Sequence, residues 1–140
     1  TLKDDKGNTV HLSDFRGKVI YMNWWGVNCG PCLYEIKNHE AKLHQQFKGM
    51  DVVFINVCVD SEEKEWKAAL KKYKLDGLNL TAPGWVDNPA CQAYNVNGIP
   101  HYVIIDEKGT IVSNKAPRPS ELEYQGENNE LKNALDKKTL

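Results

Sequence analysis

The motif Cys-Gly-Pro-Cys, which begins at Cys29, lies where a predicted strand is followed directly by a predicted helix. The preceding run 18–25 (KVIYMNWW) is mostly apolar, as expected of a buried strand. The following segment 31–47 carries apolar residues at helical spacing along one face, and Gly49 closes it. The two cysteines therefore belong to a strand-to-helix junction, which restricts the chemistry that they can perform.

Each residue of the motif has a predicted part in that junction. Pro31 suits the first helical turn, because its missing N–H has no partner there in any case. Gly30 is expected to let the backbone turn tightly. The partial positive charge of a helix N-terminus lowers the pKa of a thiol placed there. We therefore expect Cys29 to be the exposed nucleophile and Cys32, one turn later, to resolve a mixed disulfide.

Two other uses of the cysteines are less favoured but stay open. A zinc site usually needs four nitrogen or sulfur ligands. His39 and His44 follow on the same predicted helix, yet five residues of helix turn them roughly 140° apart. A permanent structural disulfide would close only a very small loop and remove little entropy from the unfolded chain. We expect no metal and no bound cofactor.

The rest of the chain alternates between predicted strands and helices. Predicted strands are two short ones within 2–12 around the turn 6–8, then 51–59, 78–81, 101–106 and 110–113. Predicted helices are 60–73, a short one at 89–95, and a last one within 120–138. Asp60 or Ser61 is expected to cap the helix 60–73. This order predicts parallel crossovers followed by an antiparallel hairpin, in a mixed sheet with helices on both faces.

Length and charge exclude several classes of protein. A chain of 140 residues favours a single domain. The net charge of −1 gives no sign of a nucleic-acid partner. No apolar run approaches the roughly 20 residues that a membrane span needs. The chain begins at Thr1 without Met and shows no signal-peptide pattern, so we expect a mature part or a fragment of a longer precursor.

Three stretches carry a resemblance to a known family: NWWGVNCGPCLYEI, FINVCVDSEEKEW and YNVNGIPHYVIIDEKGTIV. They resemble the thioredoxin-like thiol-disulfide oxidoreductases of the TlpA/ResA type, in the AhpC/TSA-related superfamily. The resemblance covers nearly the whole chain. It implies an α/β thioredoxin-like fold, a mixed central sheet with an N-terminal hairpin, and a helix–strand insertion before a cis-proline. The P-x-x-x-T/S-x-x-C pattern of the related peroxiredoxins is absent.

The resemblance also implies roles for individual residues. Cys29 matches the attacking cysteine, Cys32 the resolving one, and Pro100 the cis-proline beside them. The Ile99 backbone would pair with an extended substrate, as in strand addition, and Trp25 would flank the site. The residues implied to contact substrate are Trp25, Gly30, Pro31, Ile99 and Pro100.

The implied activity is exchange of disulfides with other proteins, in cell redox homeostasis. Partners would be protein substrates with disulfides and an upstream thiol electron donor. Proteins of this type are typically extracytoplasmic, in the bacterial periplasm or anchored to a membrane facing it, by a tether that would lie outside this chain. The Gly-Pro spacer is that of reducing thioredoxins, at about −270 mV, which favours the reducing direction. The alternative is a redox-inactive protein-binding module with the same fold.

Several positions depart from the family's pattern. Asn28 stands where Trp is frequent, which makes the rim more polar. Lys37 replaces a proline that often kinks the helix, so a straighter helix is expected. Asn23 replaces the Asp of cytosolic thioredoxins and cannot titrate, so proton transfer needs water or another group. His101 follows the cis-proline and is expected to hydrogen-bond within the fold. Glu35 is expected to be structural or partner-facing.

Two further cysteines lie outside the motif. Cys58 ends a predicted buried strand, and Cys91 lies in the short helix before Pro100. The favoured interpretation is that both are small core residues. A second disulfide or a regulatory thiol stays open, because spacing alone does not show whether their Cα atoms come close enough.

Overall fold

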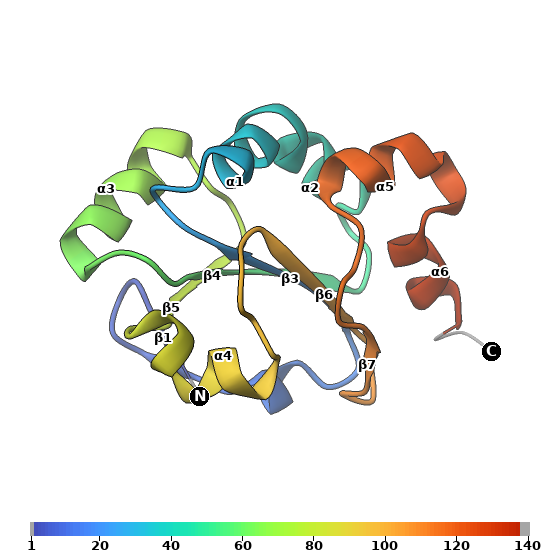
Figure 1. The fold of residues 1–140 in the computed structure, drawn as a ribbon. Helices are drawn as coiled ribbons and strands as arrows, with labels where there is room; N and C mark the ends of the chain where they lie inside the picture. Colours follow the sequence, from blue (N-terminus) through green and yellow to red (C-terminus); the bar gives the residue numbers. More distant parts are fainter. Residues whose placement is uncertain (1, 138–140) are drawn as a thin grey trace.

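The computed structural model describes residues 2–137 and contains a mixed sheet of seven strands (Figure 1). The strands are β1 (Leu2–Asp4), β2 (Thr9–Val10), β3 (Val19–Trp25), β4 (Val52–Cys58), β5 (Leu78–Thr81), β6 (His101–Ile105) and β7 (Ile111–Ser113). Their order across the sheet is β2-β1-β5-β4-β3-β6-β7. Strands β3, β4 and β5 run parallel, and the other neighbouring pairs are antiparallel. The predicted parallel crossovers and the hairpin that follows them are confirmed.

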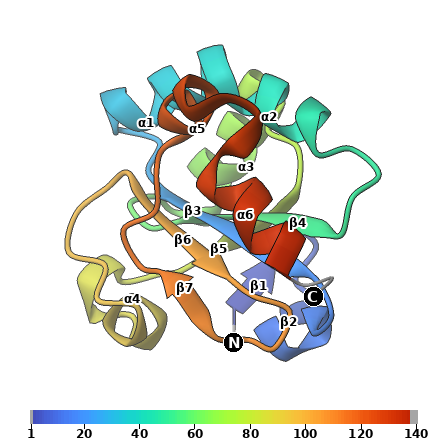
Figure 2. The same cartoon turned by 90° about the vertical axis from the view of Figure 1, so that its right-hand side faces the viewer.

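Helices follow most of the strands. They are α1 (Gly30–Glu35), the π-helical segment η2 (Ile36–Glu40), α2 (Ala41–Gln46), α3 (Glu63–Tyr73), α4 (Pro89–Ala93), α5 (Pro119–Gln125) and α6 (Glu130–Lys137). Short 3-10 turns are η1 (Leu12–Phe15), η3 (Trp85–Asp87) and η4 (Gly126–Asn128). Figures 1 and 2 show α1, α2, α3 and α5 on one face of the sheet and α4 on the other. The α/β fold with helices on both faces is as predicted.

The side chains of β3 separate the core into two layers. Successive residues of a strand point to opposite faces of the sheet. Met22 and Trp24 pack on the α4 side with Cys91. Tyr21 packs under the helices of the opposite face, in the cluster that includes residues of α2 and α6, and Trp25 packs there in a second cluster with residues of α1 and α3. All seven residues of β3 are buried, so the strand that leads to the cysteine motif is rigidly held.

Two of the predicted helices differ from expectation. The helix 31–47 is continuous from Gly30 to Gln46, but its middle is π-helical, which the sequence did not predict. The straighter helix expected from Lys37 stays a prediction. In a regular α-helix Glu40 would be turned about 80° from Cys32 over eight residues. The wider π turn keeps both side chains toward the sheet, and both are buried.

The predicted last helix is two helices. Gly126 ends α5 with a φ of 77°, a left-handed conformation that glycine adopts without strain. Asn129 then accepts a hydrogen bond from the backbone N–H of Lys132 at 2.8 Å, as the cap of α6. Leu131 and Leu135 of α6 pack on the sheet as predicted.

No helix within residues 2–137 combines the length and the apolar character needed to cross a lipid bilayer.

Candidate redox site

The two cysteines form a disulfide at the junction of β3 and α1, with Cα atoms 5.2 Å apart. Cys29 is the N-cap of α1, and its sulfur accepts a hydrogen bond from the Cys32 N–H at 3.2 Å. Cys29 is partly exposed, whereas Cys32 is 1% exposed. The predicted asymmetry between an accessible and a shielded sulfur is therefore present.

The helix behind Cys29 explains why this sulfur suits attack. The free N–H groups of a helix's first turn carry partial positive charge, which stabilises an anion placed at the N-cap. Here the Cys32 N–H is directed at the Cys29 sulfur, and Pro31 occupies the first turn. The junction can thus hold a thiolate without a nearby cationic side chain.

Gly30 does not make the tight backbone turn that the sequence predicts. It lies in α1 without a left-handed φ, and a Cβ added there would meet nothing within 4 Å. The turn into the helix is made by the extended backbone of Cys29, with φ −103° and ψ 106°. Both Gly30 and Pro31 are exposed, so they are available at the surface beside the sulfur.

Ile99 and Pro100, which directly precede β6, are joined by the predicted cis peptide bond. Both side chains are partly exposed. Ile99 packs against the core cluster that contains Cys32, and Cys29 packs against the same cluster. Strand β6 begins only at His101, so the Ile99 backbone lies outside the sheet ladder.

The position of Trp25 differs from the prediction that this residue contacts substrate. Its side chain is 0% exposed and packs with Cys32, Cys58 and Trp66. A substrate on the surface cannot contact this ring, so its predicted substrate-binding role is wrong. The reason is the strand alternation: Trp25 ends β3 on the face that α1 and α3 cover. Its contribution is to support Cys32 from below.

Asp60 belongs to the redox site and does not cap a helix. The helix after β4 begins at Glu63 and its N-cap is Glu62, so the predicted cap at Asp60 or Ser61 is wrong. The Asp60 carboxylate instead accepts the backbone N–H groups of Val27 at 2.8 Å and Asn28 at 2.9 Å. It therefore holds the loop that leads into Cys29.

The placement of Asp60 follows from the sheet. Parallel strands end at the same edge, and the register pairs Trp25 of β3 with Cys58 of β4. An acidic residue just after β4 therefore comes close to the loop just after β3. Burial raises the pKa of Asp60, but hydrogen bonds from Ser61 and from two backbone N–H groups outweigh it and lower the pKa below its ordinary 3.8. The carboxylate is charged at neutral pH.

Replacing Asp60 with Asn is expected to loosen the loop, because an amide presents an NH₂ group where the loop needs an acceptor. The free energy of unfolding at pH 7 should fall by about 1–3 kcal/mol. Since the folded-state pKa is lowered from 3.8, the stabilisation is present above that value and lost as pH falls through the lowered pKa. Urea unfolding of both proteins across pH measures this: the difference should shrink as pH falls below 3.8. A difference that stays constant throughout the acidic range would contradict it.

Gly26 and Gly30 form a matched pair for a second prediction. A Cβ at Gly26 would lie 2.4 Å from the Asp60 carboxylate and 2.7 Å from the Ile99 side chain, whereas one at Gly30 has open space. Gly26→Ala must displace both neighbours and should cost about 1–3 kcal/mol of stability. Gly30→Ala should be neutral or slightly stabilising, because alanine favours a helix. Thermal unfolding of the two variants checks this, and equal effects would contradict the packing described.

Asn23 of β3 belongs to a buried cluster of polar side chains beneath the cysteine-bearing helix. Its Nδ2 lies 3.4 Å from Glu40 Oε1 and donates to Asn56 Oδ1 at 3.2 Å. Glu40 Oε2 in turn lies 2.9 Å from His44 Nε2. Asn23 itself cannot titrate, so the buried carboxyl group of this region comes from Glu40, eight residues after Cys32.

Glu35 is structural. Its side chain is 2% exposed, and its two oxygens accept the Ser120 N–H and the Ser120 hydroxyl, each at 2.8 Å. It thus ties the helix that carries the cysteines to the first turn of α5.

The remaining histidines do not converge on the cysteines. His39 Nδ1 lies 2.6 Å from Glu123, on α5, while His44 contacts Glu40. Among residues 2–137, no group of three or more His, Cys, Asp or Glu side chains is arranged to hold a metal ion. His101 Nε2 lies 3.2 Å from the Asn114 Oδ1, so the predicted hydrogen bond within the fold is confirmed.

Cys58 and Cys91 are both buried and free, in separate core clusters. Burial, followed by the nearby Asp60 carboxylate, raises the pKa of Cys58 to about 11. Burial also raises the pKa of Cys91. The interpretation of both as core residues is confirmed for this structure.

Comparison with known proteins agrees with this geometry. Residues 1–135 match the Redoxin family. The thiol-disulfide oxidoreductase ResA of Bacillus subtilis is 32% identical over 111 residues, which cover 79% of this chain and 60% of ResA. The chain thus spans about 60% of the length of that relative.

Solved structures show the same fold. The thioredoxin domain of a thiol-disulfide oxidoreductase from Bacteroides vulgatus has a TM-score of 0.78 and 28% identity, covering 98% of this chain and 90% of that one. A thiol:disulfide interchange protein from Bacteroides sp. has a TM-score of 0.76 and 29% identity, covering 91% and 82%. Family match, relatives and fold agree: the chain belongs to the Redoxin family and groups there with the thiol-disulfide oxidoreductases of the TlpA/ResA type.

Proposed function

We propose that the protein is a thiol-disulfide oxidoreductase that reduces disulfides of other proteins. The observation that carries this is the Cys29–Cys32 disulfide at a helix N-terminus, with one sulfur accessible and the other shielded. A helix N-terminus favours the thiolate, which is the form of cysteine that attacks disulfides. The names of the relatives, which are thiol-disulfide oxidoreductases, support the same activity.

The proposed cycle has two exchange steps. In the reduced protein the Cys29 thiolate attacks one sulfur of the substrate disulfide, and the other substrate sulfur leaves as a thiolate that takes up a proton. Cys32 then loses its proton and attacks the Cys29 sulfur. This step forms the Cys29–Cys32 disulfide and releases the second substrate thiol. Two electrons have passed to the substrate, and an upstream dithiol donor must return them.

The surface around the pair fits a polypeptide substrate. The Ile99 backbone lies outside the ladder of β6, next to the cysteines, where an extended segment can add as a short strand. Gly30, Pro31 and Pro100 complete this surface, since each is exposed or partly exposed. We assign substrate contact to these four residues and catalysis to the two cysteines.

The proposal includes a location outside the cytoplasm. Disulfide exchange of this kind serves compartments where protein disulfides form and persist. The grouping with the TlpA/ResA type supports this location. Fractionation of cells that produce the protein from its own gene would test it.

Insulin reduction with dithiothreitol as donor tests the activity itself. Turnover above the donor alone supports the enzyme, and its absence promotes the redox-inactive binding module. The reduction potential tests the direction. Equilibration in graded thiol buffers, read by thiol trapping, should give a two-electron transition well below about −220 mV. A value near −120 mV would mean an oxidant instead.

A further inference from the structure

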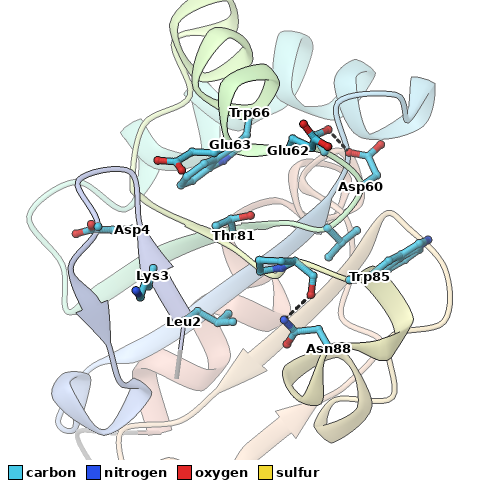
Figure 3. Close-up of a pocket in the computed structure, with 15 residues that line it drawn as sticks. Leu2, Lys3, Asp4, Asp60, Glu62, Glu63, Trp66, Thr81, Trp85 and Asn88 are labelled. Carbon is cyan, nitrogen blue, oxygen red and sulfur yellow. Dashed lines mark hydrogen bonds between the residues drawn. The ribbon is translucent and has the colours of Figure 1, made fainter.

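A large cavity, open to solvent, has Asp60 in its lining. Its volume is about 920 Å³, which is in the range of ligand pockets. The N-terminal hairpin, the loop between β4 and α3, and the segment around η3 line it (Figure 3). Neither cysteine of the pair nor the cis-proline lines it. The cavity is thus distinct from the cysteine pair, although Asp60, which lines it, also holds the loop before Cys29.

The cavity has an apolar floor and an acidic rim. Val59, Trp66 and Trp85 contribute apolar surface. In Figure 3, Asp60, Glu62 and Glu63 follow one side, and Lys3 lies across from them.

Two of these carboxylates lack a cation. Glu63 is paired with Lys67 at 2.7 Å. Within residues 2–137, neither Asp60 nor Glu62 takes part in an ion pair. The backbone N–H groups that Asp60 accepts do not neutralise its charge. The rim therefore presents uncompensated negative charge beside apolar surface.

The Trp85 indole adds a feature that suits a basic side chain. Trp85 has a φ of 54°, a left-handed conformation that is strained for a residue with a side chain. Such strain clusters at ligand-binding segments. Trp66 is 1% exposed, so the indole that a ligand can reach is the partly exposed ring of Trp85. An indole face attracts cations.

Asp60 links the cavity to the redox loop. The same carboxylate lines the cavity and holds the N–H of Asn28, the residue directly before Cys29. A polypeptide whose disulfide reaches Cys29 can therefore extend past this loop into the cavity.

We propose that this cavity binds a basic segment of the substrate polypeptide, with a Lys or Arg side chain placed between Asp60 and Glu62 over the Trp85 ring. The inference rests on the proposed function and names its substrate class, a disulfide flanked by a basic residue. Charge complementarity favours this occupant over an acidic or a neutral segment.

The test uses two disulfide-bonded peptides that differ only in one flanking residue, Lys or Gln. The unchanged protein should reduce the Lys peptide with a kcat/KM about fivefold higher, the effect of one partly exposed ion pair. Glu62→Gln should remove most of this preference. Glu65→Gln is the matched control, because Glu65 lies on the same helix and is exposed but does not line the cavity. Hydroxyethyl disulfide, which is small and neutral, should be reduced equally by all three proteins.

The outcomes separate the two proposals. Equal kcat/KM for both peptides, or equal effects of Glu62→Gln and Glu65→Gln, would overturn the basic-segment proposal. Failure to reduce even hydroxyethyl disulfide would instead overturn the proposed function. In that case peptide binding still tests the basic-segment proposal. A Lys peptide with its cysteines replaced by serine should shift the backbone NMR signals of residues 60–63 and 84–86. The corresponding Gln peptide should shift them more weakly. No shift there would reject the docking site.

Discussion

Cys29→Ser is expected to lower insulin-reducing turnover to the rate of the chemical donor alone. Cys29 is the accessible sulfur of the pair and receives the Cys32 N–H at the start of α1. A serine hydroxyl at the same place is almost fully protonated at neutral pH and forms no disulfide, so the first exchange step cannot occur. The measurement is insulin turnover with dithiothreitol, with the unfolding curve of the variant as the check that it folds.

Cys32→Ser is the paired control, and it should fail at a different step. Cys29 can still attack, but no second thiol releases the substrate, so mixed disulfides should accumulate. Non-reducing electrophoresis followed by mass spectrometry would show them as adducts on Cys29. Normal turnover by either variant would contradict the assigned roles, and adducts on Cys58 or Cys91 would mean that the core cysteines are not inert.

Glu35→Ala is expected to lower the free energy of unfolding by about 3 kcal/mol, the largest stability effect predicted for this chain. The Glu35 side chain is buried and accepts both the N–H and the hydroxyl of Ser120. Alanine removes both acceptors and leaves a gap between α1 and α5. Urea unfolding of the oxidised protein measures the loss.

Conservative replacements show whether the lost hydrogen bonds cause this effect. Glu35→Gln can accept the Ser120 N–H and donate to the Ser120 hydroxyl, so it should cost only about 1 kcal/mol. Ser120→Ala removes one of the two bonds and should lie between the two Glu35 variants. In a double-mutant cycle the Glu35→Ala and Ser120→Ala effects should be clearly non-additive. Additive effects would mean that the two residues act independently.

Local sequence patterns were sufficient for the secondary structure around the site. The apolar run 18–25 is β3, the alternation at 101–113 is the β6–β7 hairpin, and the cysteine motif lies at the start of a helix. These features depend on interactions between residues a few positions apart, such as strand alternation and helical spacing. The division of the last helix is also encoded locally, since Gly126 ends one helix and Asn129 caps the next.

The tertiary structure decided which side chains surround the cysteines. Asp60 binds Asn28 across 32 positions of sequence, because parallel strands end at the same edge of the sheet. Glu35 binds Ser120 across 85 positions, because α5 packs against the cysteine-bearing helix. Trp25 follows the pattern of the family's site, yet its place on the covered face of β3 buries it. Sequence alone determined that Cys29 and Cys32 stand at a strand-to-helix junction. Only the packing of distant segments determined what holds that junction and what lies beside it, since such contacts depend on the path of the whole chain and not on residue spacing.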